Sequence, residues 1–334
     1  MTVPGTDLES HLVSTDPTAE PTAVAVQSKS PGQLARARFR KDKLTMVSFV
    51  IVVLYTLAAL VAPLLVHLGV LDPYSTDTDL IGADTYPIGK WGGISSSHLL
   101  GVQPGTGADN LSRIWYGLSF SLGISLTATI LAVLIGVVLG LVAGASGGWV
   151  DSIIGRITDL TLAFPQTLML LALSSVAIIF ITQTLHVPGG NTAQAFYVIV
   201  VLGLFGWTSV ARIVRGQVLS LREREFVQAA ILLGASRRRL YFREILPNLW
   251  APILVSFTLI MPAFVSAEAA LSYLNVSVQP PTPTLGNVLN DSLLFASDDF
   301  VYFFAPAFLI ALIVVSFNLL GDGLRDALDP KADR

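Results

Sequence analysis

Cysteine is absent from the 334 residues of this chain. Disulfides, zinc sites held by thiolates and thiol nucleophiles are therefore excluded together. The histidines do not show the short, regular spacing of metal ligands, so a histidine metal centre is not expected either. The four lie at His11, His67, His98 and His186.

Charged side chains are also scarce. They make up 13% of the chain, whereas soluble domains carry about 25%. Hydrophobic residues make up 53%, and the mean hydropathy is +0.68. The formal net charge of −3 gives no basis for nucleic-acid binding. This composition predicts a protein embedded in lipid.

The apolar residues form long uninterrupted blocks, and a bilayer-spanning helix needs about 20 consecutive apolar residues. Between Leu44 and Leu68 the only ionisable residue is His67, and the stretch from Tyr116 to Val150 has none. We therefore predict an all-α membrane protein with one transmembrane domain over residues 44–321. Its six spans are expected at about 44–68, 116–145, 160–185, 193–217, 249–273 and 300–321.

Arginine and lysine predict the orientation, because they concentrate on the cytoplasmic side of membrane proteins. One basic group precedes the first span and another lies between spans four and five, so both segments are expected in the cytoplasm. Six crossings then place both termini in the cytoplasm and residues 69–114 outside. The basic residues are Arg36, Arg38, Arg40, Lys41 and Lys43, then Arg222, Arg224, Arg237, Arg238, Arg239 and Arg243.

The segments that flank the spans differ in composition. Residues 1–31 are rich in Thr, Pro, Ser and acidic residues and lack the pattern of a secretory signal, which predicts a disordered cytoplasmic tail. Residues 32–43 are expected to form a basic juxtamembrane helix, and residues 322–334 a cytoplasmic C-terminal tail.

Three glycines share one face of the second span. Gly136, Gly140 and Gly144 repeat at four-residue spacing. Since glycine has no side chain, this stripe predicts that a neighbouring helix approaches closely.

Charged residues near the span ends leave alternatives open. Arg212 and Arg215 either contact an ATPase or lipid phosphate, or extend to the membrane interface, which we favour. Asp159 and Glu268 are either relay carboxylates of an ion-coupled carrier or structurally paired groups. We favour pairing because both fall at span ends.

The loop at residues 222–248 combines an apolar helix, a glycine and a basic helix. Gly234 is suited to the left-handed conformation that ends a helix, and the residues before it recur at helical spacing: Gln228, Ala229, Ala230 and Leu233. Pro247 is expected to end the second piece. The pattern predicts two short helices that meet at an angle.

This loop resembles the EAA loop of ABC-importer permeases, which reads Glu-Ala-Ala, three residues, Gly, and a spacer ending in Leu-Pro. Gln228 stands where the family usually has Glu. The resemblance implies that this segment couples the membrane domain to an ATPase. The coupling residues it implies are Gln228, Ala229, Ala230, Leu233, Gly234, Ala235, Ser236, Leu246 and Pro247.

Further segments resemble the C-type permease of oligopeptide, dipeptide and nickel importers. They cover residues 144–151, 212–226, 267–283 and 318–330. One segment, 98–113, departs from the family pattern, with Leu99 for Pro and Ala108 for Arg. The resemblance implies a type I ABC-importer permease fold in the bacterial inner membrane.

The same resemblance implies three kinds of protein partner besides the lipid bilayer. A second homologous permease would complete the pathway, two ATPase subunits would bind ATP and Mg²⁺, and an extracytoplasmic solute-binding protein would deliver the solute. This chain itself would bind no cofactor and carry no ATPase site. Short peptides are the first expectation for the solute, with nickel or another small solute as the alternative. An ion-coupled secondary transporter is the alternative from a different class.

Overall fold

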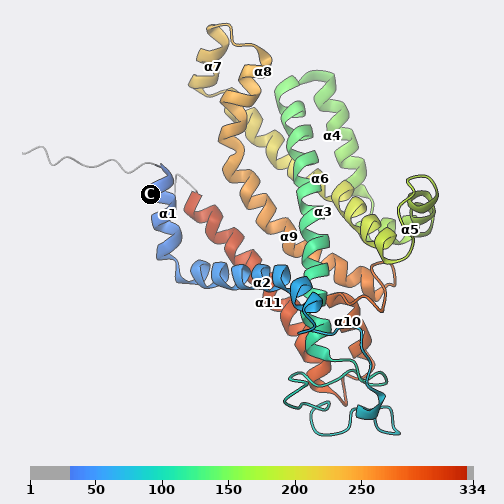
Figure 1. Ribbon diagram of the computed structural model, residues 1–334. Helices are drawn as coiled ribbons and strands as arrows, with labels where there is room; N and C mark the ends of the chain where they lie inside the picture. Colours follow the sequence, from blue (N-terminus) through green and yellow to red (C-terminus); the bar gives the residue numbers. More distant parts are fainter. Residues whose placement is uncertain (1–30, 329–334) are drawn as a thin grey trace, which may run out of the picture.

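The computed structural model describes residues 31–328, and no β-strand occurs among them (Figure 1). Six helices in this part of the chain are long and apolar enough to cross a membrane, which confirms the predicted all-α architecture. The predicted tail at residues 1–31 lies outside the described residues except for Pro31. The six helices are α2 (Lys43–His67), α3 (Asn110–Ser146), α5 (Gln166–Gln183), α6 (Asn191–Arg222), α9 (Trp250–Tyr273) and α11 (Phe300–Leu328).

Shorter helices mark the two ends of the bundle. At one end, which we call the α7 end, α7 (Glu225–Leu232) and α8 (Arg237–Arg239) follow α6. At the other, the α10 end, the 69–109 loop with its 3₁₀ turn η1 (Thr78–Leu80) lies near α10 (Leu285–Leu293) (Figure 1). The basic helix α1 (Pro31–Lys41) packs beside the last turns of α11, which continues past the expected end of the sixth span at residue 321.

The third expected span, 160–185, is interrupted. Helix α4 (Gly148–Ala163) ends at Phe164, and α5 begins only after Pro165. Proline disfavours the helical conformation in the residue before it, and Phe164 has a ψ of 134°. Hydropathy alone does not reveal this break because both sides of it are apolar.

The glycine stripe of α3 lies against α6, as predicted. A methyl group on Gly136 would stand 2.8 Å from the carbonyl oxygen of Trp207, and one on Gly140 would stand 2.6 Å from that of Ala211. Such distances leave no room for any side chain. The two helices therefore pack backbone to backbone along this face.

Replacing Gly140 by alanine tests this contact. The added methyl must push α6 away, and overpacking of this kind lowers the free energy of unfolding by about 1–3 kcal/mol. Gly123 on the same helix is the control, because a methyl group there meets nothing within 4 Å. Thermal unfolding of the detergent-solubilised protein should show a loss for Gly140→Ala and none for Gly123→Ala. Equal behaviour of the two variants would contradict the close packing.

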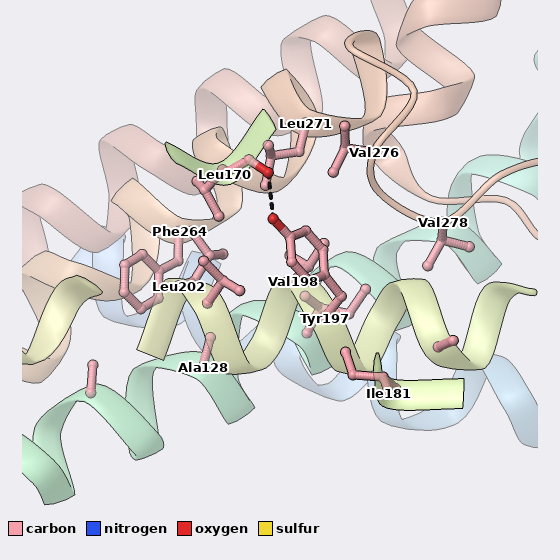
Figure 2. Packing of buried hydrophobic residues seen from close by; sticks show 14 residues of the cluster. Ala128, Leu170, Ile181, Tyr197, Val198, Leu202, Phe264, Leu271, Val276 and Val278 are labelled. Carbon is pink, nitrogen blue, oxygen red and sulfur yellow. Dashed lines mark hydrogen bonds between the residues drawn. The ribbon is translucent and has the colours of Figure 1, made fainter. Parts of the chain in front are cut away.

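One large buried cluster joins α5, α6 and α9. Tyr197 is fully buried at its centre, and its hydroxyl donates a hydrogen bond to the carbonyl of Leu170 (Figure 2). Leu271 near the end of α9 and Val278 in the following loop belong to the same cluster. The loop after α9 is thus part of the protein core.

The 98–113 segment, which departs from the family pattern, forms an ordered cap on α3. Asp109 accepts a hydrogen bond from the Ser112 N–H at 2.8 Å, and its other oxygen lies 3.0 Å from His98 Nδ1. Arg113 is buried and donates to Asp291 of α10 at 3.1 Å. The cap therefore connects the start of α3 with α10.

Candidate coupling site

Helix α7 ends as the sequence predicts. Gly234 has a φ of +76°, the left-handed region that favours glycine. Its N–H donates to the carbonyl of Ile231 at 2.9 Å, and the Ala235 N–H donates to that of Ala230 at 3.0 Å. These two bonds form a Schellman motif, which satisfies the last carbonyls of the helix. Ser236 then caps α8 by accepting a hydrogen bond from the Arg239 N–H.

The prediction that Pro247 ends the second helix is wrong. A π-helical turn, η2 (Leu240–Ile245), and a 3₁₀ turn, η3 (Leu246–Leu249), lead directly into α9. In the wider π turn the Leu246 N–H donates to the carbonyl of Tyr241. This shift accommodates a proline, which lacks an N–H and needs room for its ring. Arg237–Tyr273 is therefore one continuous helical segment.

Three apolar side chains anchor this segment to the bundle. Val227 of α7, Ile245 of η2 and Leu249 of η3 are fully buried. They pack in one cluster with Val214 and Val218 of α6. Since α6 is itself fixed to α3, the coupling segment sits on a rigid base.

The opposite face of the segment exposes apolar side chains. Leu232 and Leu233 are both 88% exposed at the tip, and Ile231, Phe226 and Phe242 are also exposed. Exposed apolar groups clustered in this way mark interaction sites. Sequence reasoning named only Leu233 of these, although an apolar pair beside a glycine in a basic loop is a usable signal.

The other predicted coupling residues divide between this tip and the base. Leu246 packs on the buried cluster, so it belongs to the base of the segment. Ala230 and Ala235 are half-buried behind the tip. The exposed members are Gln228, Ala229, Gly234, Ser236 and Pro247.

Gln228 stands where the family usually has glutamate, and its side chain makes a hydrogen bond to the end of α6. Its side-chain amide donates to the carbonyl of Arg222 at 2.8 Å. Arg222 is the last residue of α6, so this bond fixes the angle between α6 and α7. An ionised glutamate has no hydrogen to donate and makes no such bond.

Two arginines near this end are paired with aspartates of the same chain. Arg212 donates to Asp159 at 3.0 Å, and Arg215 binds both carboxylate oxygens of Asp151, with Nη2 to Oδ2 at 2.7 Å. Both pairs join α4 to α6, so Asp159 is paired as favoured. Arg215 holds the pKa of Asp151 below its usual range. The second pair therefore stabilises α4 throughout neutral pH, and this stabilisation is lost only on acidification.

A charge swap tests the pair. Arg215→Asp places two carboxylates together and should lower the free energy of unfolding by about 1–2 kcal/mol, while adding Asp151→Arg should restore most of the loss. Arg212→Asp is the matched control, since its pair is exposed and such pairs contribute little. Thermal unfolding in detergent measures all three. No recovery in the double variant would mean that the pair does not hold α4.

Comparison with known sequences places these features in a family. The sequence profile described as binding-protein-dependent transport system inner membrane component matches residues 136–334. This chain belongs to that family. A second profile, the N-terminal TM domain of oligopeptide transport permease C, matches residues 30–87. The chain is accordingly a multi-pass inner-membrane permease component.

Relatives in the family match over nearly their whole length. The dipeptide transport system permease protein DppC of Alkalihalophilus pseudofirmus is 37% identical, over 96% of each chain. The oligopeptide transport system permease protein OppC of Bacillus subtilis is 38% identical, over 92% of each chain. The glutathione transport system permease protein GsiD of Shigella flexneri is 35% identical, over 91% of this chain and 92% of its own.

A solved structure shows the same fold. The inward-facing MetNI methionine ABC transporter has a chain that matches with a TM-score of 0.52 at 15% identity, over 66% of this chain and 97% of its own. The predicted type I importer permease fold is thereby confirmed.

Proposed function

We propose that this chain is the membrane-spanning permease subunit of an ATP-driven importer of short peptides. The three relatives named above transport, by their names, a dipeptide, an oligopeptide and glutathione, which are all peptides. Their identity to this chain extends along almost all of it, including both bundle ends. The family's dependence on a binding protein favours an importer over an ion-coupled carrier.

The observation that carries the coupling role is the exposed apolar tip of α7. Leu232 and Leu233 have no partner surface within the described residues and are held out on an anchored base. A water-exposed pair of this kind fits a groove on an ATPase subunit. We propose that two such subunits hold ATP and Mg²⁺, that a second homologous permease completes the pathway, and that an extracytoplasmic binding protein delivers the peptide.

The orientation follows from the same assignment. If α7 meets a cytoplasmic ATPase, the α7 end and both termini face the cytoplasm, in agreement with the arginine distribution. The α10 end then faces outward, toward the binding protein. This chain transmits movement and lines half of the path, and ATP is hydrolysed by its partners.

The proposed cycle uses the continuous helix Arg237–Tyr273. Closure of the ATPase subunits around ATP displaces α7 and α8. Because α8 leads without a break into α9, the displacement tilts α9 within the bundle. The path then opens toward the binding protein, and hydrolysis of ATP allows the return.

Leu232→Asp tests the docking tip. The side chain is 88% exposed, so the substitution should change the free energy of unfolding by less than about 0.5 kcal/mol. A charge at the centre of an apolar contact should nevertheless abolish co-purification of the ATPase subunits and peptide uptake.

Two controls separate docking from general damage. Leu232→Met keeps the apolar contact and should retain the ATPase subunits. Leu294→Asp changes a leucine that is 83% exposed at the α10 end and should also retain them. Full retention in Leu232→Asp would exclude the α7 tip as the docking site.

The solute is tested on the cognate binding protein. Calorimetric titration with di-, tri- and longer peptides, and with a nickel chelate, should show binding of peptides only. Binding of the nickel chelate without any peptide would replace the peptide assignment by the alternative.

A further inference from the structure

A carboxylate is buried inside the bundle near the α10 end. Glu268 of α9 has no exposed surface, and three serine hydroxyls donate to it. The Ser121 hydroxyl donates to Oε2 at 2.8 Å. The hydroxyls of Ser272 and Ser277 donate to Oε1 at 3.1 and 3.0 Å. We call these four residues the Glu268 cluster.

The hydrogen-bond partners of this carboxylate are neutral in the described part of the chain. Within residues 31–328, no arginine, lysine or histidine is ion-paired with Glu268. It is therefore paired with neutral hydroxyls, not with a charged group, and it lies near the end of α9, five residues before Tyr273. Removing a carboxyl group from water is costly unless hydrogen bonds replace the water, and three donors here do so.

The cluster joins four separate segments of the chain. Ser121 belongs to α3, Ser272 to α9, and Ser277 to the loop after α9. The oxygen of Ser121 also accepts the backbone N–H of Leu285, the first residue of α10, at 3.0 Å. Thus the start of α10 is tied through one hydroxyl to α3 and to Glu268.

A second link ties α10 directly to α9. The hydroxyl oxygens of Ser272 and Thr284 lie 3.4 Å apart, and Thr284 caps α10 in a capping box with Asn287. Gly286 packs so closely on α9 that a methyl group there would stand 2.7 Å from the Cα of Ala269. The start of α10 therefore lies directly on the part of α9 that carries Glu268.

The position of Glu268 on α9 connects this cluster with the other end of the molecule. Figure 1 shows α9 running from the end with α7 and α8 to the end with α10. From Arg237 to Glu268 the segment is helical without a break, a length of about 45 Å at 1.5 Å per residue. One helical segment thus connects the α7 end with Glu268.

We propose that Glu268 is the positioning residue that makes α10 and the 274–284 loop move with α9 as one body. This inference rests on the proposed function. It assigns a role to the Glu268 cluster: the cluster transfers the movement of the ATPase subunits to the outward-facing α10 end. The hydroxyl donors hold α10 on α9 while α9 tilts. Without the carboxylate, α9 moves and α10 does not follow.

Substitutions at Glu268 test this transfer of movement. The measurement uses the complete importer reconstituted in liposomes. Glu268→Ala removes all three acceptor contacts, and the loss of three hydrogen bonds shifts an equilibrium by about tenfold or more. Stimulation of ATP hydrolysis by peptide-loaded binding protein should fall by at least about that factor, with unstimulated hydrolysis unchanged. Glu268→Gln keeps the oxygen for Ser272 and Ser277 and should give an intermediate loss.

The control is Ser256, a buried serine of α9 that lies outside the Glu268 cluster. Ser256 bonds only to the carbonyl of Pro252, four residues before it. Ser256→Ala should leave the stimulation unchanged, whereas Ser121→Ala should reduce it. Full stimulation in Glu268→Ala would overturn the proposal.

A disulfide between α9 and α10 tests the same point, both with and without Glu268. The chain contains no cysteine, so Ser272→Cys with Thr284→Cys introduces the only reactive pair, where the side-chain oxygens are 3.4 Å apart. In the Glu268→Ala background, oxidation should restore stimulation, and reduction should abolish it again. With Glu268 present, the oxidised pair should transport as well as the reduced pair, because α9 and α10 already move together.

The outcomes separate this inference from the proposed function. Arrest of transport by the disulfide with Glu268 present would show that α10 must move against α9, and would overturn the inference even if Glu268→Ala fails to fold. Failure of the oxidised pair to rescue Glu268→Ala would overturn it as well. Absence of peptide-stimulated hydrolysis in the unmodified importer would instead refute the proposed function. The yield of the disulfide with and without Glu268 still reports whether the carboxylate holds α10 on α9.

Discussion

The close packing of α3 against α6 is the contact on which the rest of the structure depends. Glycines at Gly136, Gly140 and Gly144 allow the two backbones to approach until Val210, Val214 and Val218 of α6 fill the space. In lipid there is little hydrophobic gain from joining two apolar helices, so close van der Waals contact must supply the stability. The valines that meet the glycines also lie in the cluster that anchors Val227, Ile245 and Leu249. Fixing α6 therefore also fixes the base of the coupling segment.

The second constraint is the absence of a break between α8 and α9. A proline inside a helix normally introduces a kink, because it removes a hydrogen bond and its ring meets the preceding turn. Here the π turn before Pro247 takes up the extra space, and the Leu246 N–H still finds the carbonyl of Tyr241. The result is one helical segment from Arg237, just after the exposed tip, to Tyr273 at the far end of α9. A flexible joint at Pro247 would absorb movement that the proposed cycle needs to transmit.

Much of this architecture could be predicted from the sequence because its causes are local. A run of apolar residues spans a membrane whatever its neighbours are, and the glycine spacing places Gly136, Gly140 and Gly144 on one face. Gly234 ends α7 because of its own backbone freedom. The two errors both concern prolines. Hydropathy does not register Pro165, and the effect of Pro247 depends on the turn that precedes it.

Charged side chains find their partners in two different ways in this structure. Near the α7 end, arginine and aspartate form pairs that remain partly open to solvent, which keeps the cost of removing both charges from water low. Inside α9 a cationic partner for Glu268 would have to be buried as well, which doubles that cost. Neutral hydroxyls avoid the cost of burying a second charge, since a serine is inexpensive to bury and still donates a hydrogen bond. Three serines drawn from α3, α9 and the following loop meet there only after folding. Ser121 lies 147 residues from Glu268 along the chain, so the sequence revealed the carboxylate but not this partner.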